Sequence, residues 1–234
     1  MRKAQAVKCP ILRSRATVPT GDNSRWHVKT GSTEMIESVD ALRHLYGNAK
    51  ERSVRKQIDH LDVHCKRFIA MSPFLVIASS DGQGALDSSP RGGAPGFVRT
   101  ANDHTLLIPD SPGNNRLDTL TNIIATGSVG LLFMIPGVDE TLRVNGRARL
   151  NDDASLLQTF ADDKRTPKLA IEVTVTDAYL HCAKAFMRSK LWSADSLVDR
   201  NLLPTMGEML SDQTGMKSAP ETQQQMLARY VNDL

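Results

Sequence analysis

The chain is 234 residues long, with 40% hydrophobic and 24% charged residues, which fits one large domain or one domain with appendages. Its 29 lysine and arginine residues nearly balance 26 aspartate and glutamate residues, and only 5% of its residues are aromatic. The balanced charge argues against a dedicated nucleic-acid-binding protein, and the low aromatic content argues against an RNA-stacking platform.

The start of the chain, residues 1–31, is basic and lacks the apolar region of a secretory signal. We expect it to be a disordered extension, with an organelle transit peptide or a start codon placed too early as alternatives. No segment approaches the ~18 consecutive apolar residues that span a membrane. The three cysteines are far apart and form no CxxC pair, so neither a zinc ribbon nor a disulfide framework is expected. These features predict a cytoplasmic protein.

Two helices are predicted before the first strand. Apolar residues recur at steps of three and four between Met35 and Leu45, with Ser32 or Thr33 as a cap and Gly47 as a stop. A second, longer helix is predicted from about 49 to 70, where a charged face lies opposite an apolar stripe. His60 and His64 would share one face of that helix, but without further ligands we expect surface histidines and no metal site.

After Pro73 the pattern changes to short apolar runs separated by turn residues, which is typical of strands. The candidate strands cover residues 74–78, 86–89, 97–99, 105–108, 129–135, 141–150 and 170–179. Short helices are predicted at 117–125 and 154–161, and others near 206–210 and 221–232. Because strands and helices do not alternate, we predict a mainly β protein with flanking helices, either a barrel or a sandwich. The polar segment 193–234 should wrap the surface of the same domain.

The first candidate site is the segment 87–93, a strand end that holds Asp87, Ser88, Ser89 and Arg91 and runs into a glycine-rich loop. Hydroxyls, a guanidinium and close backbone approach are the features that hold a phosphate group. Taken alone, however, this segment is more typical of a surface turn with a solvated arginine.

The second candidate site lies where a strand ends near Ile108 and a helix begins near Leu117, with Asn114 or Asn115 as its cap. Arg116 at a helix N-terminus is unfavourable unless an anion binds there. The alternative is an ion pair between Arg116 and Asp118 or Asp110. Asn122, one turn further along the helix, either contributes to the site or lies exposed.

The third candidate segment runs from His181 to Trp192. Lys184 and Arg188 are four residues apart and share a face if the segment is helical. Cys182 beside His181 could suggest a cysteine nucleophile, but adjacent residues of a strand point to opposite faces, so a buried thiol is the favoured interpretation.

Together and in chain order, several segments resemble the pyridoxamine 5′-phosphate oxidase-like FMN-binding split-barrel proteins, in particular their general FMN-dependent branch. The segments that carry the resemblance are 68–74, 87–92, 107–118, 130–146 and 181–185. The resemblance covers about Met35 to Leu234. The arginine–lysine strand motif and the C-terminal Arg-Leu-His segment of the true vitamin B6 oxidases have no clear counterpart here, which argues against pyridoxamine phosphate as the substrate.

The resemblance implies a six-stranded split barrel within residues 32–192, a homodimer, and one FMN per subunit at the dimer interface. The cofactor-binding residues that it implies are Ser88, Ser89, Arg91, Ile108, Asp110, Asn115, Arg116, Leu117, Asn122, Thr141, Lys184, Arg188 and Ser189. Lys184, Arg188 and Ser189 would close the site, and the other subunit could supply them. No catalytic side chain is nominated, because the flavin itself accepts or donates the hydride.

The leading hypothesis is therefore an FMN-dependent oxidoreductase that acts on a small molecule or on NAD(P)H. A non-catalytic flavin-binding protein is the alternative from another class. A split barrel that uses haem would need a histidine ligand near the cleft, for which His181 is the candidate. One that uses the deazaflavin F420 would need a longer basic groove than the sequence offers.

Overall fold

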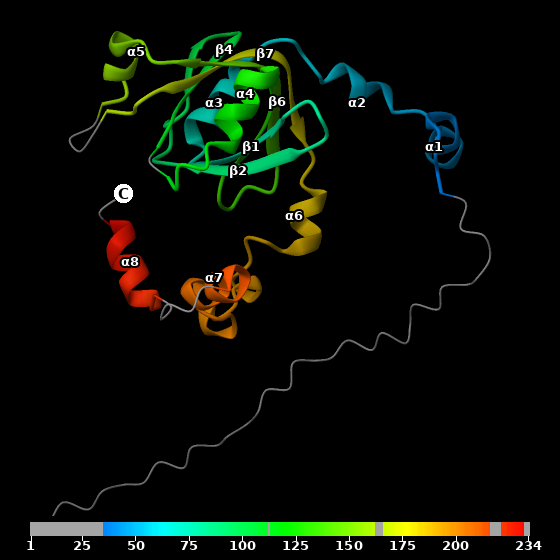
Figure 1. Ribbon diagram of the computed structural model, residues 1–234. Helices are drawn as coiled ribbons and strands as arrows, with labels where there is room; N and C mark the ends of the chain where they lie inside the picture. Colours follow the sequence, from blue (N-terminus) through cyan, green and yellow to red (C-terminus); the bar gives the residue numbers. More distant parts are fainter. Residues whose placement is uncertain (1–34, 112, 162–165, 216–220, 232–234) are drawn as a thin grey trace, which may run out of the picture. The chain divides into compact units, whose positions relative to one another are not determined.

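The computed structural model describes residues 35–111, 113–161, 166–215 and 221–231 (Figure 1). It divides the chain into two compact units, residues 1–48 and residues 49–234. The expected disordered extension and the predicted caps Ser32 and Thr33 lie outside the described residues. The extents that we predicted for the barrel and for the C-terminal wrap stay predictions.

Within the described residues, the first unit contributes one helix, α1 (Val39–Tyr46). The Ser38 side chain caps its start by accepting a hydrogen bond from the backbone N–H of Ala41, at 3.1 Å. Gly47 ends the helix with a φ of 72°, a conformation that glycine adopts without a steric penalty. The predicted helix and its stop are thus confirmed, but the helix begins at Val39.

The predicted long helix is wrong, because the chain forms two short helices, α2 (Glu51–Arg55) and α3 (Val63–Met71), with an extended stretch between them. In that stretch Ile58 pairs with Ala178: each backbone N–H donates to the other's carbonyl, at 3.1 and 2.7 Å. The side chain of Asp62 then caps α3. Tertiary pairing at Ile58 therefore overrides the local helical pattern.

This break also separates the two histidines that were expected to share a helical face. His64 lies in α3, whereas His60 lies before it, with its ring 6.1 Å from the ring of His104. His60 also hydrogen-bonds Asp59 at 2.9 Å. Among the described residues, no three histidine, cysteine, aspartate or glutamate side chains are grouped so that they could hold a metal ion.

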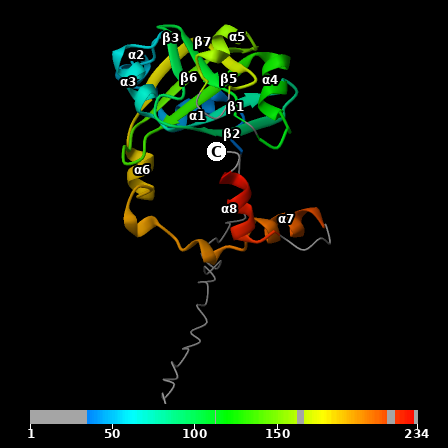
Figure 2. The ribbon, with the colours of Figure 1, turned by 90° about the vertical axis from the view of Figure 1, so that its left-hand side faces the viewer.

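Seven strands form one antiparallel sheet in the order β2-β1-β5-β6-β7-β4-β3, which can be followed in Figure 1 and Figure 2. The strands are β1 (Phe74–Ser80), β2 (Leu86–Gly92), β3 (Arg99–Asn102), β4 (Thr105–Pro109), β5 (Ser128–Met134), β6 (Thr141–Asn151) and β7 (Ala170–His181). Six of the predicted strands are confirmed, whereas the strand predicted at 97–99 is displaced, because β3 begins only at Arg99. The six strands that the resemblance implied are too few, because the short β3 extends the sheet beyond β4.

The sheet is not closed into a barrel, because its end strands β2 and β3 do not pair with each other among the described residues. β2 pairs only with β1, and none of its residues is buried. The side chains on both faces of β2 are therefore free to make contacts outside the hydrophobic core.

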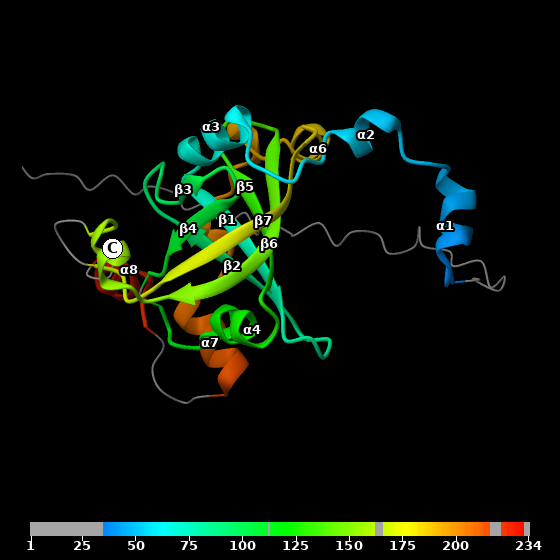
Figure 3. The same cartoon turned by 90° about the horizontal axis from the view of Figure 1, so that it is seen from above.

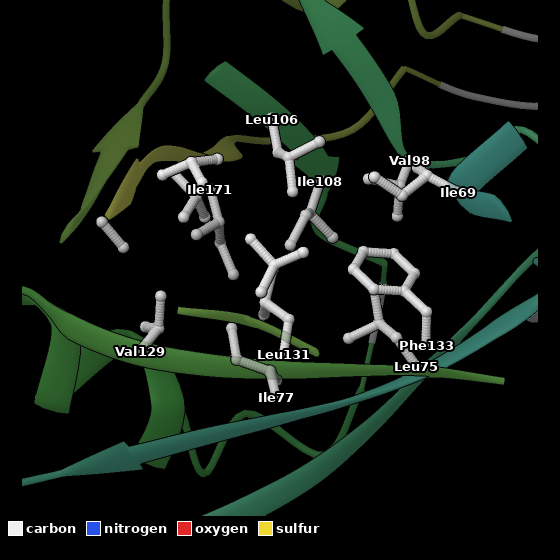
Figure 4. Close-up of a cluster of buried hydrophobic side chains, with 14 of the residues drawn as sticks. Ile69, Leu75, Ile77, Val98, Leu106, Ile108, Val129, Leu131, Phe133 and Ile171 are labelled. Carbon is white, nitrogen blue, oxygen red and sulfur yellow. The ribbon is translucent and has the colours of Figure 1, made fainter. Parts of the chain in front are cut away.

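The hydrophobic core lies on one face of the curled sheet. Along each strand the side chains alternate between the two faces, so that β5 buries Leu131 and Phe133 and exposes their neighbours more. Leu106 and Ile108 of β4, both fully buried, point toward Ile77 and Leu131 across the core (Figure 4). The sheet therefore bends around its own core.

Helices α3 and α4 (Asp118–Thr126) lie at opposite ends of the sheet in Figure 2 and Figure 3. α3 buries Cys65, and burial raises the pKa of this thiol to about 12, so it stays protonated at neutral pH. α4 buries Ile123, and its Asn122 side chain donates to Ser79 Oγ of β1 at 3.0 Å. α4 is thereby fixed against β1, which sets the direction of its N-terminus.

The remaining helices are α5 (Ala154–Gln158), α6 (Lys184–Ser189), η2 (Ala194–Ser196), η3 (Arg200–Leu202), α7 (Met206–Thr214) and α8 (Gln223–Val231). The helices predicted near 154–161, 206–210 and 221–232 are thus confirmed. Trp192 stacks on Phe186 and donates from Nε1 to the carbonyl of Val138 at 2.9 Å, which ties the segment after α6 to the β5–β6 loop. No described helix has both the length and the apolar composition needed to cross a bilayer.

Candidate functional site

A cleft of about 1060 Å³ opens where β2, β4 and the start of α4 meet. α4 and β2 lie side by side at this end of the sheet (Figure 1, Figure 3). The segment that leads into β7 completes the wall. The described lining residues include Ser89, Pro90, Arg91, Phe97, Asp110, Asn114, Asn115, Arg116, Leu117, Asp118, Thr119 and Lys168.

On β2 the side chains of Ser89 and Arg91 lie on one face, because successive residues of a strand point to opposite faces. Ser89 and Arg91 are half-buried and line the cleft, whereas Ser88, which precedes Ser89, is exposed on the opposite face and does not line it. The first candidate segment is therefore part of the cleft, with Ser88 excluded from it.

Arg91 is held by two hydrogen bonds and keeps a third donor without a partner. Its Nη1 donates to the Pro90 carbonyl at 2.9 Å, and its Nη2 donates to Thr119 Oγ1 at 3.3 Å. Its Nε is buried and has no hydrogen-bond partner among the described residues. Such a buried donor costs about 1–3 kcal/mol when unmatched, so an acceptor brought by a ligand would be favourable here.

The start of α4 is shaped by two residues with unusual backbone conformations. Asn115 has a φ of 58° and Leu117 a φ of 61°, which are rare for residues other than glycine and are often found at functional sites. Leu117 is the N-cap and makes no side-chain cap hydrogen bond, so the first-turn N–H groups of α4 have no N-cap side chain as acceptor.

The predicted asparagine cap is therefore wrong. Asn114 accepts a hydrogen bond from the backbone N–H of Arg116 at 3.1 Å instead of capping the helix. A helix N-terminus whose cap makes no side-chain hydrogen bond and that lies beside an arginine is a typical anion-binding arrangement.

Arg116 forms the ion pair that sequence reasoning named as the alternative. Its Nε lies 2.8 Å from Asp118 Oδ2, and both side chains are largely exposed. Exposed ion pairs of this kind contribute about 0–1 kcal/mol, so a phosphate group could draw Arg116 away at little cost.

Asp110 and Lys168 complete the charges of the cleft. Burial raises the pKa of the Asp110 carboxyl, while the nearby positive charges of Arg91 and Lys168 lower it by less. The cations Arg91, Arg116 and Lys168 outnumber the lining carboxylates Asp110 and Asp118 among the described residues. The cleft thus has a modest excess of positive charge.

Asp110→Asn is expected to become progressively more stable than the unaltered protein as the pH rises from about 3 to about 7. Because burial raises the Asp110 pKa above its value in the unfolded chain, the ionised carboxylate opposes folding, and that penalty grows as the group ionises. Urea unfolding at several pH values measures the difference.

Asp153→Asn is the control of opposite sign. Hydrogen bonds from Ser155 and from the backbone of Leu156 hold the pKa of Asp153 below its ordinary value, so this variant should lose relative stability as the pH rises. A pH-independent difference for Asp110→Asn would contradict the prediction.

The structure brings six of the predicted site residues together in the cleft: Ser89, Arg91, Asp110, Asn115, Arg116 and Leu117. Seven others do not line it: Ser88, Ile108, Asn122, Thr141, Lys184, Arg188 and Ser189. Ile108, Asn122 and Thr141 are buried, whereas the three residues of α6 are exposed.

Two expectations for the third candidate segment differ from the structure. Cys182 is exposed, so its thiol is not buried as expected. His181 does not line the cleft; its Nε2 is buried without a partner among the described residues. Burial, followed by the positive charges of Arg143 and Lys56, lowers the pKa of His181.

Sequence reasoning included Asp87 in the first candidate segment without giving it a role, and it missed Thr119 and Lys168 as parts of the cleft. Asp87 accepts hydrogen bonds from Ser89 Oγ at 3.0 Å and from Thr119 Oγ1 at 2.5 Å. The two-residue spacing from Asp87 to Ser89 and Arg91 was a usable signal, because it places all three on one face of the strand. Thr119 and Lys168 carry no local signal, since only the fold brings them to β2.

Comparison with known proteins gives one match to a family model. The model described as pyridoxamine 5′-phosphate oxidase matches residues 61–182, which is more than half of the chain. No curated protein matches the chain.

Solved structures give weaker likenesses. HupZ of Group A Streptococcus is 16% identical with a TM-score of 0.42, and the alignment covers 50% of this chain and 90% of that one. A putative pyridoxamine 5′-phosphate oxidase from Lactobacillus delbrueckii is 13% identical with a TM-score of 0.40, over 52% and 99% of the two chains. An FMN-binding protein from Syntrophomonas wolfei is 8% identical with a TM-score of 0.39, over 61% and 96%.

Proposed function

Because the chain belongs to the pyridoxamine 5′-phosphate oxidase family, we propose that its cleft binds FMN and that the protein is an FMN-dependent oxidoreductase. The observation that carries the proposal is the start of α4. There, a helix N-terminus without a side-chain cap opens beside Arg91, whose buried Nε has no partner among the described residues. These are donors for an anion, and FMN carries a phosphate.

The residues of the cleft divide into two groups in this proposal. Arg91, Arg116 and the first-turn N–H groups of α4 hold the phosphate, and Lys168 adds positive charge nearby. Ser89 and Asp110 face the polar chain of the cofactor, where acceptor atoms can bind hydroxyl groups. Bound FMN would supply hydride acceptance and donation, while the protein binds it, orients it and excludes water.

A homodimer in which each copy completes the other's cleft is part of the proposal. Lys184, Arg188 and Ser189 are exposed on α6 and do not line the cleft of their own chain. In the proposed dimer they lie over the partner's flavin, and a small-molecule substrate or NAD(P)H binds against the flavin ring.

An absorbance spectrum of the purified protein, followed by heat release and chromatography of the pigment, tests this function. Flavin bands and released FMN, with NAD(P)H consumption by the yellow protein, are the expected result. Flavin without turnover under any donor would favour the flavin-carrier alternative. A haem Soret band, a deazaflavin spectrum, or a colourless protein that ignores added FMN would each overturn the proposal.

A further inference from the structure

Asp87 lies next to the cleft wall without being part of it. Its neighbours at two-residue steps along β2, Ser89 and Arg91, line the cleft, as does Thr119 of α4, whereas Asp87 does not. Asp87 is half-buried, and its carboxylate accepts hydrogen bonds from both hydroxyl groups. One carboxylate therefore connects the edge strand to the first turn of the helix.

The direction of these hydrogen bonds follows from the number of protons available. An ionised carboxylate can only accept, and each hydroxyl has a single proton to donate. The proton of Thr119 Oγ1 points at Asp87 Oδ2, at 2.5 Å, so the lone pairs of that oxygen accept from Arg91 Nη2 at 3.3 Å. The hydrogen bonds therefore run in one direction: Arg91 donates to Thr119, and Thr119 donates to Asp87.

The same reasoning fixes the role of Ser89. Its Oγ lies 3.0 Å from both oxygens of Asp87, so its proton is committed to the carboxylate. Toward the cleft Ser89 can then offer only lone pairs, which suit a hydroxyl group of a ligand rather than a phosphate oxygen.

We propose that Asp87 is a positioning residue for phosphate recognition: through Thr119 it holds the Arg91 guanidinium toward the phosphate, and by taking the proton of Ser89 it makes that residue a hydrogen-bond acceptor. This inference rests on the proposed function, because it assumes that the cleft receives a phosphorylated ligand. It adds that selectivity for the phosphate is set by a side chain that does not touch the ligand.

The test compares the affinities for FMN and for riboflavin, which lacks the phosphate. Asp87→Ala should weaken FMN binding by about tenfold, the scale of one charge-assisted hydrogen bond, and riboflavin binding much less. Asp87→Asn, whose Oδ1 still accepts from Thr119, should recover part of the preference for FMN. Asp177→Ala is the matched control, because Asp177 is half-buried on β7 and accepts from Asn145 and Thr176 outside the cleft.

Thr119→Val provides a second, nearly isosteric variant that removes only the hydroxyl relay. It should reproduce the loss of phosphate selectivity, and combining it with Asp87→Ala should add little, because the two changes break one chain of hydrogen bonds. Urea midpoints of all variants show whether each one folds.

Equal losses for FMN and riboflavin would show a merely structural role and overturn the inference, as would FMN binding by Asp87→Ala equal to that of Asp177→Ala. Titration with inorganic pyrophosphate separates the two proposals. If the unaltered protein binds pyrophosphate but no flavin, the proposed function fails. The role of Asp87 is then tested by comparing the pyrophosphate affinities of the Asp87→Ala variant and the unaltered protein. If it binds neither, both proposals fail.

Discussion

Replacing Arg91 and Arg116 together by alanine is expected to abolish the copurification of flavin and to weaken FMN binding by a factor on the order of 10²–10⁴. Each arginine can give the phosphate a charge-assisted hydrogen bond worth roughly 1.5–3 kcal/mol, and the two contributions act on one group. Arg91 should account for the larger share, because Arg116 must first give up its ion pair with Asp118. Quenching of flavin fluorescence on titration measures the affinity.

The matched control replaces Arg147 and Arg149 on β6. Both are exposed, hydrogen-bond Ser128 and Glu172 respectively, and lie outside the cleft. This double variant removes the same charge but should keep FMN. A yellow Arg91/Arg116 double variant with unchanged affinity would remove both arginines from the phosphate site.

Phe133→Ala is expected to lower the free energy of unfolding by about 3–5 kcal/mol, a large share of the ~5–15 kcal/mol that a typical domain has. Phe133 is fully buried in β5 within the hydrophobic cluster, so the smaller side chain would leave a cavity there (Figure 4). Urea or thermal unfolding measures the loss.

Leu86→Ala on the edge strand β2 is the control for this loss of packing. The Leu86 side chain is 83% exposed, so its replacement should change the stability by less than about 0.5 kcal/mol. If Phe133→Ala lowered the free energy of unfolding by less than about 1 kcal/mol, Phe133 would not be a central core residue.

Most of the fold could be predicted because its strands show their period in the sequence. Runs such as Val129 to Ile135 alternate buried and less buried positions around Leu131 and Phe133, and the pattern does not depend on distant partners. The break between α2 and α3 could not be predicted, because its cause is the pairing of Ile58 with Ala178 far along the chain. Strand order was equally inaccessible, since hydrogen bonding between distant strands leaves no local signal.

Part of the candidate site could likewise be predicted from the sequence, and part could not. Ser89, Arg91, Asn115 and Arg116 lie in contiguous polar segments at strand ends, and residue chemistry was enough to single them out. The helix cap was predicted wrongly because Leu117 occupies the N-cap position in a left-handed conformation. Asparagine adopts that conformation more readily than leucine, so the residue types favoured an asparagine cap. Roles assigned through the resemblance alone, such as those of α6, stay predictions.

The position of β2 at the edge of the sheet has a consequence for how this protein could diversify. The strand that supplies Ser89 and Arg91 has no buried residue and one neighbouring strand, whereas β1, β4, β5, β6 and β7 all contribute residues to the core. In many proteins, mutations that create new binding properties lower the stability of the fold. Mutations on β2 can change ligand preference with a smaller loss of stability, because they leave the core intact. Descendants of such a scaffold could acquire different cofactors while inheriting the same core.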